Sequence, residues 1–123
     1  MTDMKLIVKI MALISEQEKA KEYNPLVFNT HCIGCPQAQI DGVAKKLQDA
    51  GYIEGLMTTE DIDNCEENLI LWEYSKPSVT LAGIEYMETN SAFKKAKESL
   101  ADTMYAAGKS VLNALIARFL LLR

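Results

Sequence analysis

The sequence predicts an α+β protein, mainly α-helical, in which a winged helix-turn-helix domain over residues 1–90 precedes a long C-terminal helix over residues 91–123. Two segments in the N-terminal part repeat apolar residues at helical spacing, and two β-rich segments follow them. The C-terminal part again follows a helical pattern. Helix, strand, short helix, helix and then a two-stranded wing is the chain order of a winged helix-turn-helix protein. A chain of 123 residues suffices for one such domain with an appended element.

The first predicted helix covers residues 4–21. Its apolar residues lie three and four positions apart and make one hydrophobic stripe, formed by Leu6, Ile7, Ile10, Met11 and Ile14. Thr2 or Asp3 is its expected N-cap. After the break at the first proline we expect a short strand over residues 26–28, and then a brief turn or helix over residues 29–34.

A second helix is predicted from Pro36 to Ala50, because proline is tolerated in a first helical turn and Gly51 is favoured just after the last one. Its buried face is expected to hold Ile40, Val43, Ala44 and Leu47. This assignment leaves an outward face made of Ala38, Gln39, Asp41, Gly42, Lys45, Lys46 and Asp49. In a winged helix-turn-helix protein this would be the recognition helix.

Two strands are predicted next, over residues 52–57 and 69–74, where β-branched and aromatic residues are frequent. The segment between them, residues 58–68, is polar and would form the tip of a two-stranded wing. Five carboxylates are concentrated in this tip, on Glu60, Asp61, Asp63, Glu66 and Glu67. Nonspecific attraction to DNA comes from Lys and Arg, so such a tip would repel the phosphate backbone.

Two further helices are expected in the C-terminal part. Thr80 should cap a short helix over residues 81–89, with Ile84 and Met87 facing inward. Ser91 is the expected cap of the final helix, which would be about 50 Å long as one continuous rod.

The segment Pro77–Glu88, with the sequence PSVTLAGIEYME, is followed by Asn90–Ser91 and Lys94–Ala96. Together with the glycine-tyrosine-isoleucine-x-glycine phrase at Gly51–Gly55, it resembles the signature of the YjcQ-like family, small winged-helix proteins common in prophages of Gram-positive bacteria. The resemblance covers about residues 1–97. It implies a winged-helix fold and a phage or prophage setting, and it carries no established activity or catalytic residues. The chain departs from the family pattern around His31 to Pro36 and in its more apolar C-terminus.

If the domain binds DNA, the recognition helix should enter the major groove. The candidate contacts are Ala38, Gln39, Gly42, Lys45 and Lys46. The amide of Gln39 can read an adenine edge, the two small residues permit close backbone approach, and the two lysines can bind phosphates. The same lysines would also suit the solvated face of any amphipathic helix.

The charge balance opposes DNA binding. Residues 1–90 hold seven Lys or Arg and fifteen Asp or Glu, a balance of −8, whereas residues 91–123 carry +4 and the whole chain −4. Two functions therefore remain open. One is a DNA-associated regulator, and the other is a protein-binding adaptor whose acidic wing meets a basic partner without nucleic acid.

The segment His31-Cys32-Ile33-Gly34-Cys35 contains the residue types of a metal or redox site. With Cys65 it could supply a Cys3His zinc set, but no second paired motif accompanies it. Buried cysteine commonly serves as a small hydrophobe, so we expect a core role for Cys35 and neither a metal nor a cofactor. The chain has one histidine, no Gly-rich phosphate loop and no nucleophile with an evident base, which argues against an enzyme.

The C-terminal helix has a broad apolar face that includes Met104, Leu112, Leu115, Phe119 and Leu122. Left in water, such a face would promote aggregation, so something must cover it. Self-association into a homodimer is favoured, and the alternatives are packing on the first helix of the same chain and binding to a membrane surface. Polar residues interrupt the apolar run too often for a bilayer span. Three cysteines, an odd number without a disulfide spacing pattern, fit a cytoplasmic location.

Overall fold

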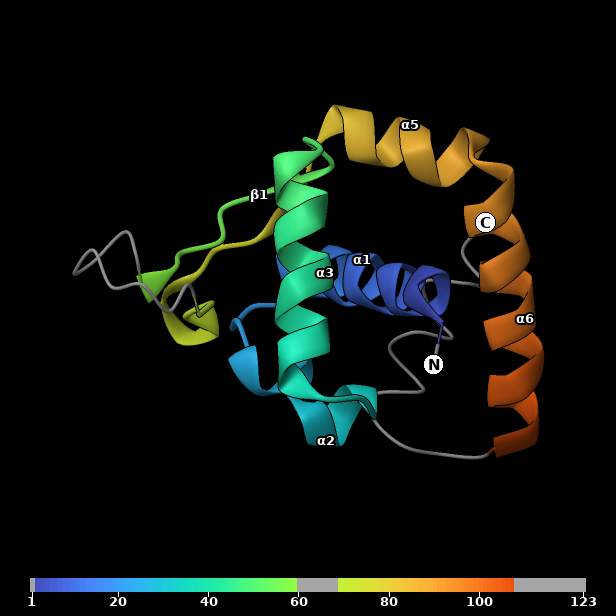
Figure 1. Cartoon of the computed structure of the whole chain (residues 1–123), viewed down its shortest axis with the longest axis horizontal. Coiled ribbons are helices and arrows are strands. Elements are labelled where there is room, and N and C mark those ends of the chain that lie inside the picture. The colour runs from blue at the N-terminus through green and yellow to red at the C-terminus, as the bar shows by residue number, and fades with distance from the viewer. Residues whose placement is uncertain (1, 60–68, 108–123) are drawn as a thin grey trace.

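The computed structural model describes residues 2–59 and 69–107 of the chain, with side chains through Leu100. These residues form a mainly α-helical protein with one small antiparallel sheet, as the sequence predicts (Figure 1). In chain order the elements are α1 (Asp3–Lys19), η1 (Pro25–Phe28), α2 (Thr30–Ile33), α3 (Gln37–Asp49), β1 (Ile53–Glu54), η2 (Trp72–Tyr74), β2 (Ser78–Val79), α5 (Leu81–Thr89) and α6 (Ser91–Ala107). The hairpin that contains β1 projects from one side of α3, and α6 runs along the other side (Figure 1).

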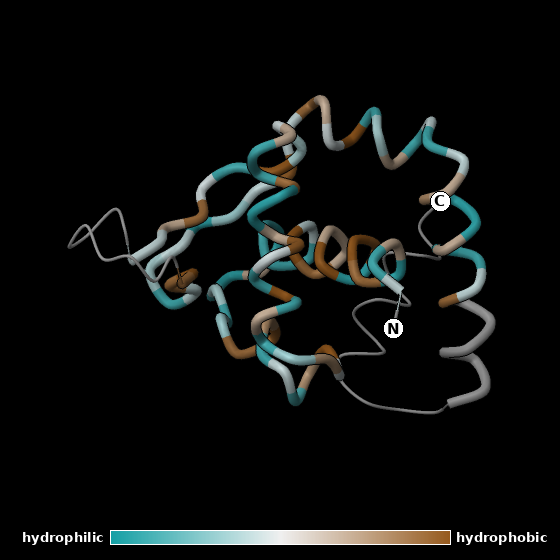
Figure 2. The backbone as a smooth tube through the Cα atoms, in the orientation of Figure 1, coloured by the Kyte–Doolittle hydropathy of each residue, from teal (hydrophilic) through white to brown (hydrophobic). Residues whose placement is uncertain are grey.

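Helix α1 lies at the centre of the fold and supplies a large part of the hydrophobic core (Figure 2). Thr2 caps it as predicted, because its Oγ1 accepts a hydrogen bond from the backbone N–H of Lys5 at 3.3 Å. Helices α3 and α6 and strand β2 all pack against α1. Its buried residues therefore extend beyond the single predicted stripe and include Leu6, Val8, Ile10, Met11, Ala12, Leu13 and Ile14.

The segment after α1 differs from the prediction. Residues 26–28, expected as a short strand, belong to the 3-10 helix η1. The Asn24 side chain accepts a hydrogen bond from the N–H of Leu26 at 3.1 Å, and Pro25 occupies the first position of the turn. This local side-chain bond stabilises a turn in place of an extended strand. The turn buries Phe28 completely, and α2 follows where a brief turn or helix was expected.

Helix α3 and its exit match the prediction. The four residues of the expected core face, Ile40, Val43, Ala44 and Leu47, are all buried. Gly51 follows the helix with a φ of 84°, a left-handed conformation that glycine adopts without strain. The N–H of Tyr52 then donates to the carbonyl of Leu47 at 3.0 Å, and β1 begins at the next residue. The chain therefore changes from helix to hairpin where the sequence predicts.

The hairpin pairs in two places. At its base β1 pairs with β2 in antiparallel fashion, with Ile53 opposite Val79. Further along the ribbon Thr58 and Ile70 form an isolated antiparallel bridge. Next to this bridge the N–H of Leu71 donates to the carbonyl of Met57 at 2.8 Å. The two predicted strand segments therefore do lie side by side, as expected of a wing.

The predicted strand over residues 69–74 is correct only at its start. The 3-10 helix η2 interrupts it, and the Trp72 side chain stacks on Phe28 in the core with ring centroids 4.3 Å apart. The chain rejoins the ribbon at Lys76, whose N–H donates to the carbonyl of Gly55 at 3.0 Å. Gly55 has a φ of 91°, and a Cβ there would lie 2.1 Å from the Lys76 oxygen. The close approach of the two chains therefore requires glycine at this position.

Thr80 caps α5 as predicted, because its Oγ1 accepts a hydrogen bond from the N–H of Gly83 at 3.0 Å. The inward face of this helix is predicted only in part, since Met87 is buried but Ile84 is 37% exposed. A Cβ added to Gly83 would lie 2.1 Å from the carbonyl oxygen of Tyr52. The helix therefore approaches the hairpin backbone closely at a glycine, next to the partly exposed Ile84.

Helix α6 begins at Ser91, but the capping residue is the one before it. The Asn90 side chain accepts a hydrogen bond from the N–H of Phe93 at 2.9 Å, so the prediction of a Ser91 cap was wrong. Phe93 and Leu100 are buried, Tyr86 lies edge-on to Phe93 with ring centroids 5.6 Å apart, and the helix packs along α1. The described part of α6 therefore folds back onto the first helix of its own chain.

Candidate nucleic-acid interface

Helix α3 turns one long face away from α1 (Figure 1). Ala38, Gly42 and Lys46 are exposed on this face, and Lys45 and Gln39 are partly exposed. Their spacing of three and four residues places them along one side of the helix. A Cβ added to Gly42 would meet no heavy atom within 4 Å among the described residues. The helix backbone is therefore open to an approaching partner at this point.

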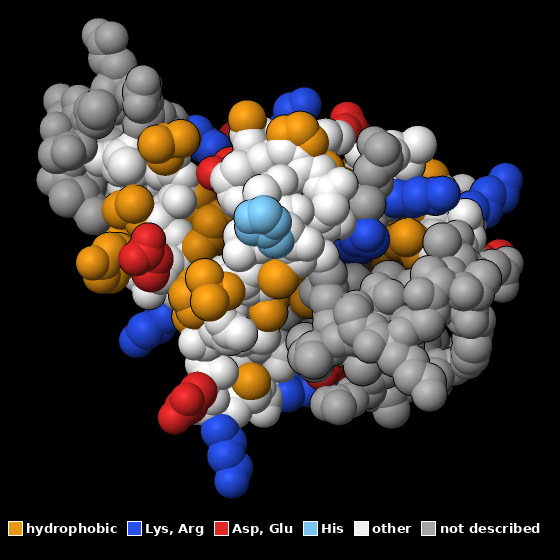
Figure 3. All heavy atoms as spheres, turned by 90° about the horizontal axis from the view of Figure 1, so that it is seen from below, with side chains coloured by type: hydrophobic (Ala, Val, Ile, Leu, Met, Phe, Trp, Pro, Cys, Tyr) orange, Lys and Arg blue, Asp and Glu red, His pale blue; other side chains and the backbone are white. Residues whose placement is uncertain are grey.

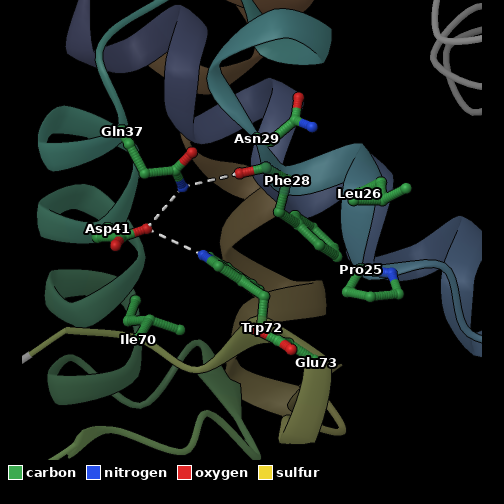
Figure 4. Close-up of a pocket in the computed structure, with 9 residues that line it drawn as sticks. All are labelled: Pro25, Leu26, Phe28, Asn29, Gln37, Asp41, Ile70, Trp72 and Glu73. Carbon is green, nitrogen blue, oxygen red and sulfur yellow. Dashed lines mark hydrogen bonds between the residues drawn. The ribbon is translucent and has the colours of Figure 1, made fainter.

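Asp41 was predicted to belong to this outward face, and that prediction was wrong. Its side chain is only 8% exposed and lies on the inner side of α3 (Figure 4). Its Oδ1 accepts hydrogen bonds from Trp72 Nε1 at 2.9 Å and from Gln37 Nε2 at 3.0 Å. A buried indole N–H needs an acceptor, and a buried carboxylate needs donors, so each group satisfies the other.

The inward position of Asp41 changes the electrostatics of the exposed face. Of the charged side chains that the sequence assigned to the outside of α3, the two lysines and the exposed Asp49 remain there. The α3 side chains of this face therefore carry a formal charge of +1, with the Asp3 carboxylate of α1 beside them, although the balance of residues 1–90 is −8. The local charge on α3 is more favourable to an anionic partner than the helical wheel alone indicates.

Gln39, the candidate for reading a base edge, lies beside the start of α1. Its Nε2 donates a hydrogen bond to Asp3 Oδ1 at 3.3 Å. Both groups are at the surface, so an exposed hydrogen bond of this length is a weak constraint. A partner that binds Gln39 would have to replace this bond.

The cysteine and histidine segment does not converge on one point. His31 is exposed, Cys32 is partly exposed, and Cys35 is buried within the hydrophobic core. Among the described residues, no three His, Cys, Asp or Glu side chains come together as a metal site would require. Cys65, the fourth candidate, lies outside the part of the chain that the structure describes.

The thiol of Cys35 has the environment of a core residue. Burial raises its pKa, and the nearby Lys9 ammonium partly opposes that shift. Burial also lowers the pKa of Lys9, whose Nζ donates a hydrogen bond to the carbonyl of Ile33 at 3.2 Å. A thiol with a raised pKa is a poor nucleophile at neutral pH, because the thiolate is the reactive form.

A groove that the sequence did not predict lies behind α3, between η1 and η2 (Figure 4). It has a volume of about 360 Å³ and is lined by Pro25, Leu26, Phe28, Asn29, Gln37, Asp41, Ile70, Trp72 and Glu73. Tyr23 donates its hydroxyl hydrogen to the carbonyl of Trp72, one of the lining residues, at 2.7 Å, and burial raises the pKa of Tyr23 to about 12. Trp72 is the only tryptophan in the chain.

A space-filling view from the side of η1 and α2 displays hydrophobic side chains next to the single histidine, His31 (Figure 3). Leu26 is 65% exposed, and Tyr74, in η2, is 64% exposed.

The predicted oligomer interface falls almost entirely beyond the described residues. The side chain of Met104, and all of Leu112, Leu115, Phe119 and Leu122, lie outside them. Within the described ranges, no helix is both long and apolar enough to cross a bilayer.

Taken in order, the described elements define a mainly α-helical protein in which a helix-turn-helix precedes an antiparallel hairpin. The sequence profile of the YjcQ protein family matches residues 7–102. Because this match spans most of the chain, the chain belongs to the YjcQ family, as its Pro77–Glu88 segment indicated. No curated protein and no solved structure matches it.

Proposed function

We propose that this YjcQ family member is a non-enzymatic, DNA-associated winged-helix regulator of phage or prophage origin, in which α3 is the recognition helix. The observation that carries the proposal is the outward face of α3, where two small residues lie beside two lysines and Asp41 is turned inward. The helix also stands between a turn and a hairpin, which is the order in which winged helix-turn-helix proteins present a recognition helix.

Each residue of this face has a role that follows from its chemistry. Ala38 and Gly42 let the helix backbone approach the floor of the major groove, since neither extends a long side chain. Lys45 and Lys46 lie nearer the C-terminal end of α3, where they can bind phosphates on the groove edge. Gln39 can exchange its weak bond to Asp3 for a bond to a base.

The acidic balance of residues 1–90 limits the affinity of such an interface. Two lysines contribute little counterion release, and the carboxylates at positions 60–67 repel phosphates. We therefore expect binding at low salt that weakens steeply as salt is added.

A charge-reversal experiment tests the proposal. The Lys45→Glu/Lys46→Glu variant should lose binding to a mixed-sequence DNA duplex in a low-salt mobility shift. The matched control is Lys94→Glu/Lys95→Glu, which makes the same charge change at two exposed lysines of α6. The proposal requires that the control retain most of the binding. If the wild-type protein does not bind, or the two variants behave alike, α3 is not a DNA-reading helix.

A second candidate function is a protein-binding adaptor without nucleic acid. It is supported by the five carboxylates at positions 60–67 and the −8 balance of residues 1–90, which favour a basic partner. A wild-type protein that ignores DNA at low salt would favour this function over the first.

We also propose that the protein is a homodimer that associates through its C-terminal segment. The support is the apolar face that the sequence predicts on the C-terminal helix, because such a face would promote aggregation if it were left in water. Deletion of residues 106–123 should convert the dimer into a monomer, as measured by light scattering. A full-length protein that is already monomeric would contradict this proposal. The cysteine content supports a cytoplasmic location.

A further inference from the structure

The groove behind α3 has apolar residues on its η1 side and polar residues on its α3 side (Figure 4). Pro25 and Leu26 stand on one side, with the stacked rings of Phe28 and Trp72 between them and α3 (Figure 4). On the α3 side the polar residues are Gln37 and Asp41, while η2 contributes Glu73 and Asn29 follows η1 (Figure 4). A volume of about 360 Å³ is within the range of small-molecule sites, which are mostly apolar with a few placed polar groups.

The side-chain donors of Gln37 and Trp72 are already used within the protein. Gln37 uses both hydrogens of its Nε2, one for the Phe28 carbonyl and one for Asp41 Oδ1, each at 3.0 Å. Trp72 Nε1 also donates to Asp41 Oδ1, so both of these bonds end on the same carboxylate oxygen. Within the described residues, Asp41 Oδ2 accepts no hydrogen bond and neither Asp41 nor Glu73 forms an ion pair.

This pattern leaves one oxygen of Asp41 open to a ligand. Although Asp41 is only 8% exposed, its Oδ2 is not sealed from solvent, so water or a ligand can reach it. The second ionisable group on the groove, Glu73, is also a carboxylate. An occupant that suits the site would therefore bring a hydrogen-bond donor and a positive charge, together with an apolar body for the walls.

We propose that the groove binds a small organic cation, an ammonium group carried on an apolar or aromatic body. The ammonium group bonds to Asp41 and lies in the field of Glu73, while the apolar body packs between Leu26 and Trp72. The proposal concerns binding alone and does not depend on whether α3 reads DNA.

Trp72 provides the readout, because the chain has no other tryptophan and this one lines the groove. The probe is 2-phenylethylammonium, titrated into the full-length protein at neutral pH while tryptophan fluorescence is recorded. We expect a saturable change with half-saturation at about 1 mM or below. The uncharged analogue 2-phenylethanol should bind about tenfold more weakly, since a charge-assisted hydrogen bond is lost. The anionic analogue phenylacetate should give no saturable change.

Variants that keep the tryptophan locate the site. Asp41→Asn retains an acceptor oxygen for Trp72 and Gln37 but removes the charge, and it should abolish the preference for the amine over the alcohol. Glu73→Gln is an exposed change that should weaken amine binding by a few fold. The control is Glu85→Gln, an exposed carboxylate on α5 that should leave binding unchanged.

Two results would overturn the proposal. One is equal binding of the amine and the alcohol to the wild-type protein, which would mean that the carboxylates do not select the ligand. The other is the absence of a saturable response to the amine at concentrations of roughly ten times the expected half-saturation value. Neither result would affect the DNA-binding proposal, which is measured without the amine.

Discussion

The two faces of α3 use their polar residues in opposite ways. On the outer face, Lys45 and Lys46 reach solvent beside small residues, and Gly42 leaves the backbone open. On the inner face, Asp41 is buried and bonded to the only tryptophan. Helix α3 therefore bonds to the segment after the hairpin tip with one side and leaves its other side open to solvent. Changes on the inner face should therefore cost stability, whereas changes on the outer face should alter binding.

The largest expected effect is on the aromatic stack behind α3. Trp72→Ala removes a 7% exposed indole that stacks on Phe28, and it should lower the free energy of unfolding by about 3–5 kcal/mol. Tyr74→Ala, in the same 3-10 helix but at a 64% exposed position, should change it by less than about 0.5 kcal/mol. Urea denaturation followed by circular dichroism measures both. Equal losses would mean that the stack does not anchor the hairpin.

The next effect compares two carboxylates on α3. Asp41→Ala leaves Trp72 Nε1 and Gln37 Nε2 without this acceptor, and it should lower the free energy of unfolding by about 1–3 kcal/mol. Asp49→Ala, at an exposed position in the last turn, should be neutral within about 0.5 kcal/mol. The same denaturation experiment distinguishes them. If Asp41→Ala left the free energy of unfolding unchanged, the Asp41 carboxylate of the wild-type protein would have to lie in solvent, contrary to the structure.

A smaller effect is expected at alkaline pH. The pKa of Tyr23 is raised to about 12 in the folded protein, whereas an unfolded tyrosine ionises near 10. The unfolded chain therefore loses this proton first, and stability should fall as the pH rises from about 10 to 12. The loss should be about 1 kcal/mol, because the half-buried phenol is partly screened by water. Tyr23→Phe should remove this component of the pH dependence, and an unchanged pH profile would contradict the assignment.

The smallest effect has the opposite sign. Gly42→Ala adds a methyl group that meets no described neighbour, and alanine is the better helix former. The substitution should raise the free energy of unfolding by about 0.5–1 kcal/mol and, if the outer face approaches DNA closely, weaken DNA binding. Thermal denaturation and a mobility shift of the same variant measure the two quantities. A variant with greater stability and unchanged binding would argue against close approach at Gly42.

Local patterns in the sequence predict most of the helices. The spacing of apolar residues predicts α1 and α3. Gly51 predicts the end of α3, and Thr80 predicts the start of α5. Each of these signals acts within a few residues of the chain. The YjcQ motif predicts the family, which the profile match confirms.

The features that sequence reasoning missed depend on partners far apart in the chain. A helical wheel places every charged residue outward, so it cannot anticipate that Asp41 meets an indole 31 positions later. For the same reason the strand pattern around Trp72 predicts neither the stacking of Trp72 on Phe28 nor the groove that these two residues line. A signal was present, because a lone tryptophan in a wing needs an N–H acceptor and Asp41 is a carboxylate on the adjoining helix.

The salt dependence of DNA binding tests the central claim most directly. If Lys45 and Lys46 each contact a phosphate, the Lys45→Ala/Lys46→Ala variant should have a slope of log K against log salt that is shallower by about 1.8 than the wild-type slope. The Lys94→Ala/Lys95→Ala variant should retain the wild-type slope. The same slope for all three proteins, or a loss confined to the α6 variant, would contradict the assignment of the outer face of α3 to DNA.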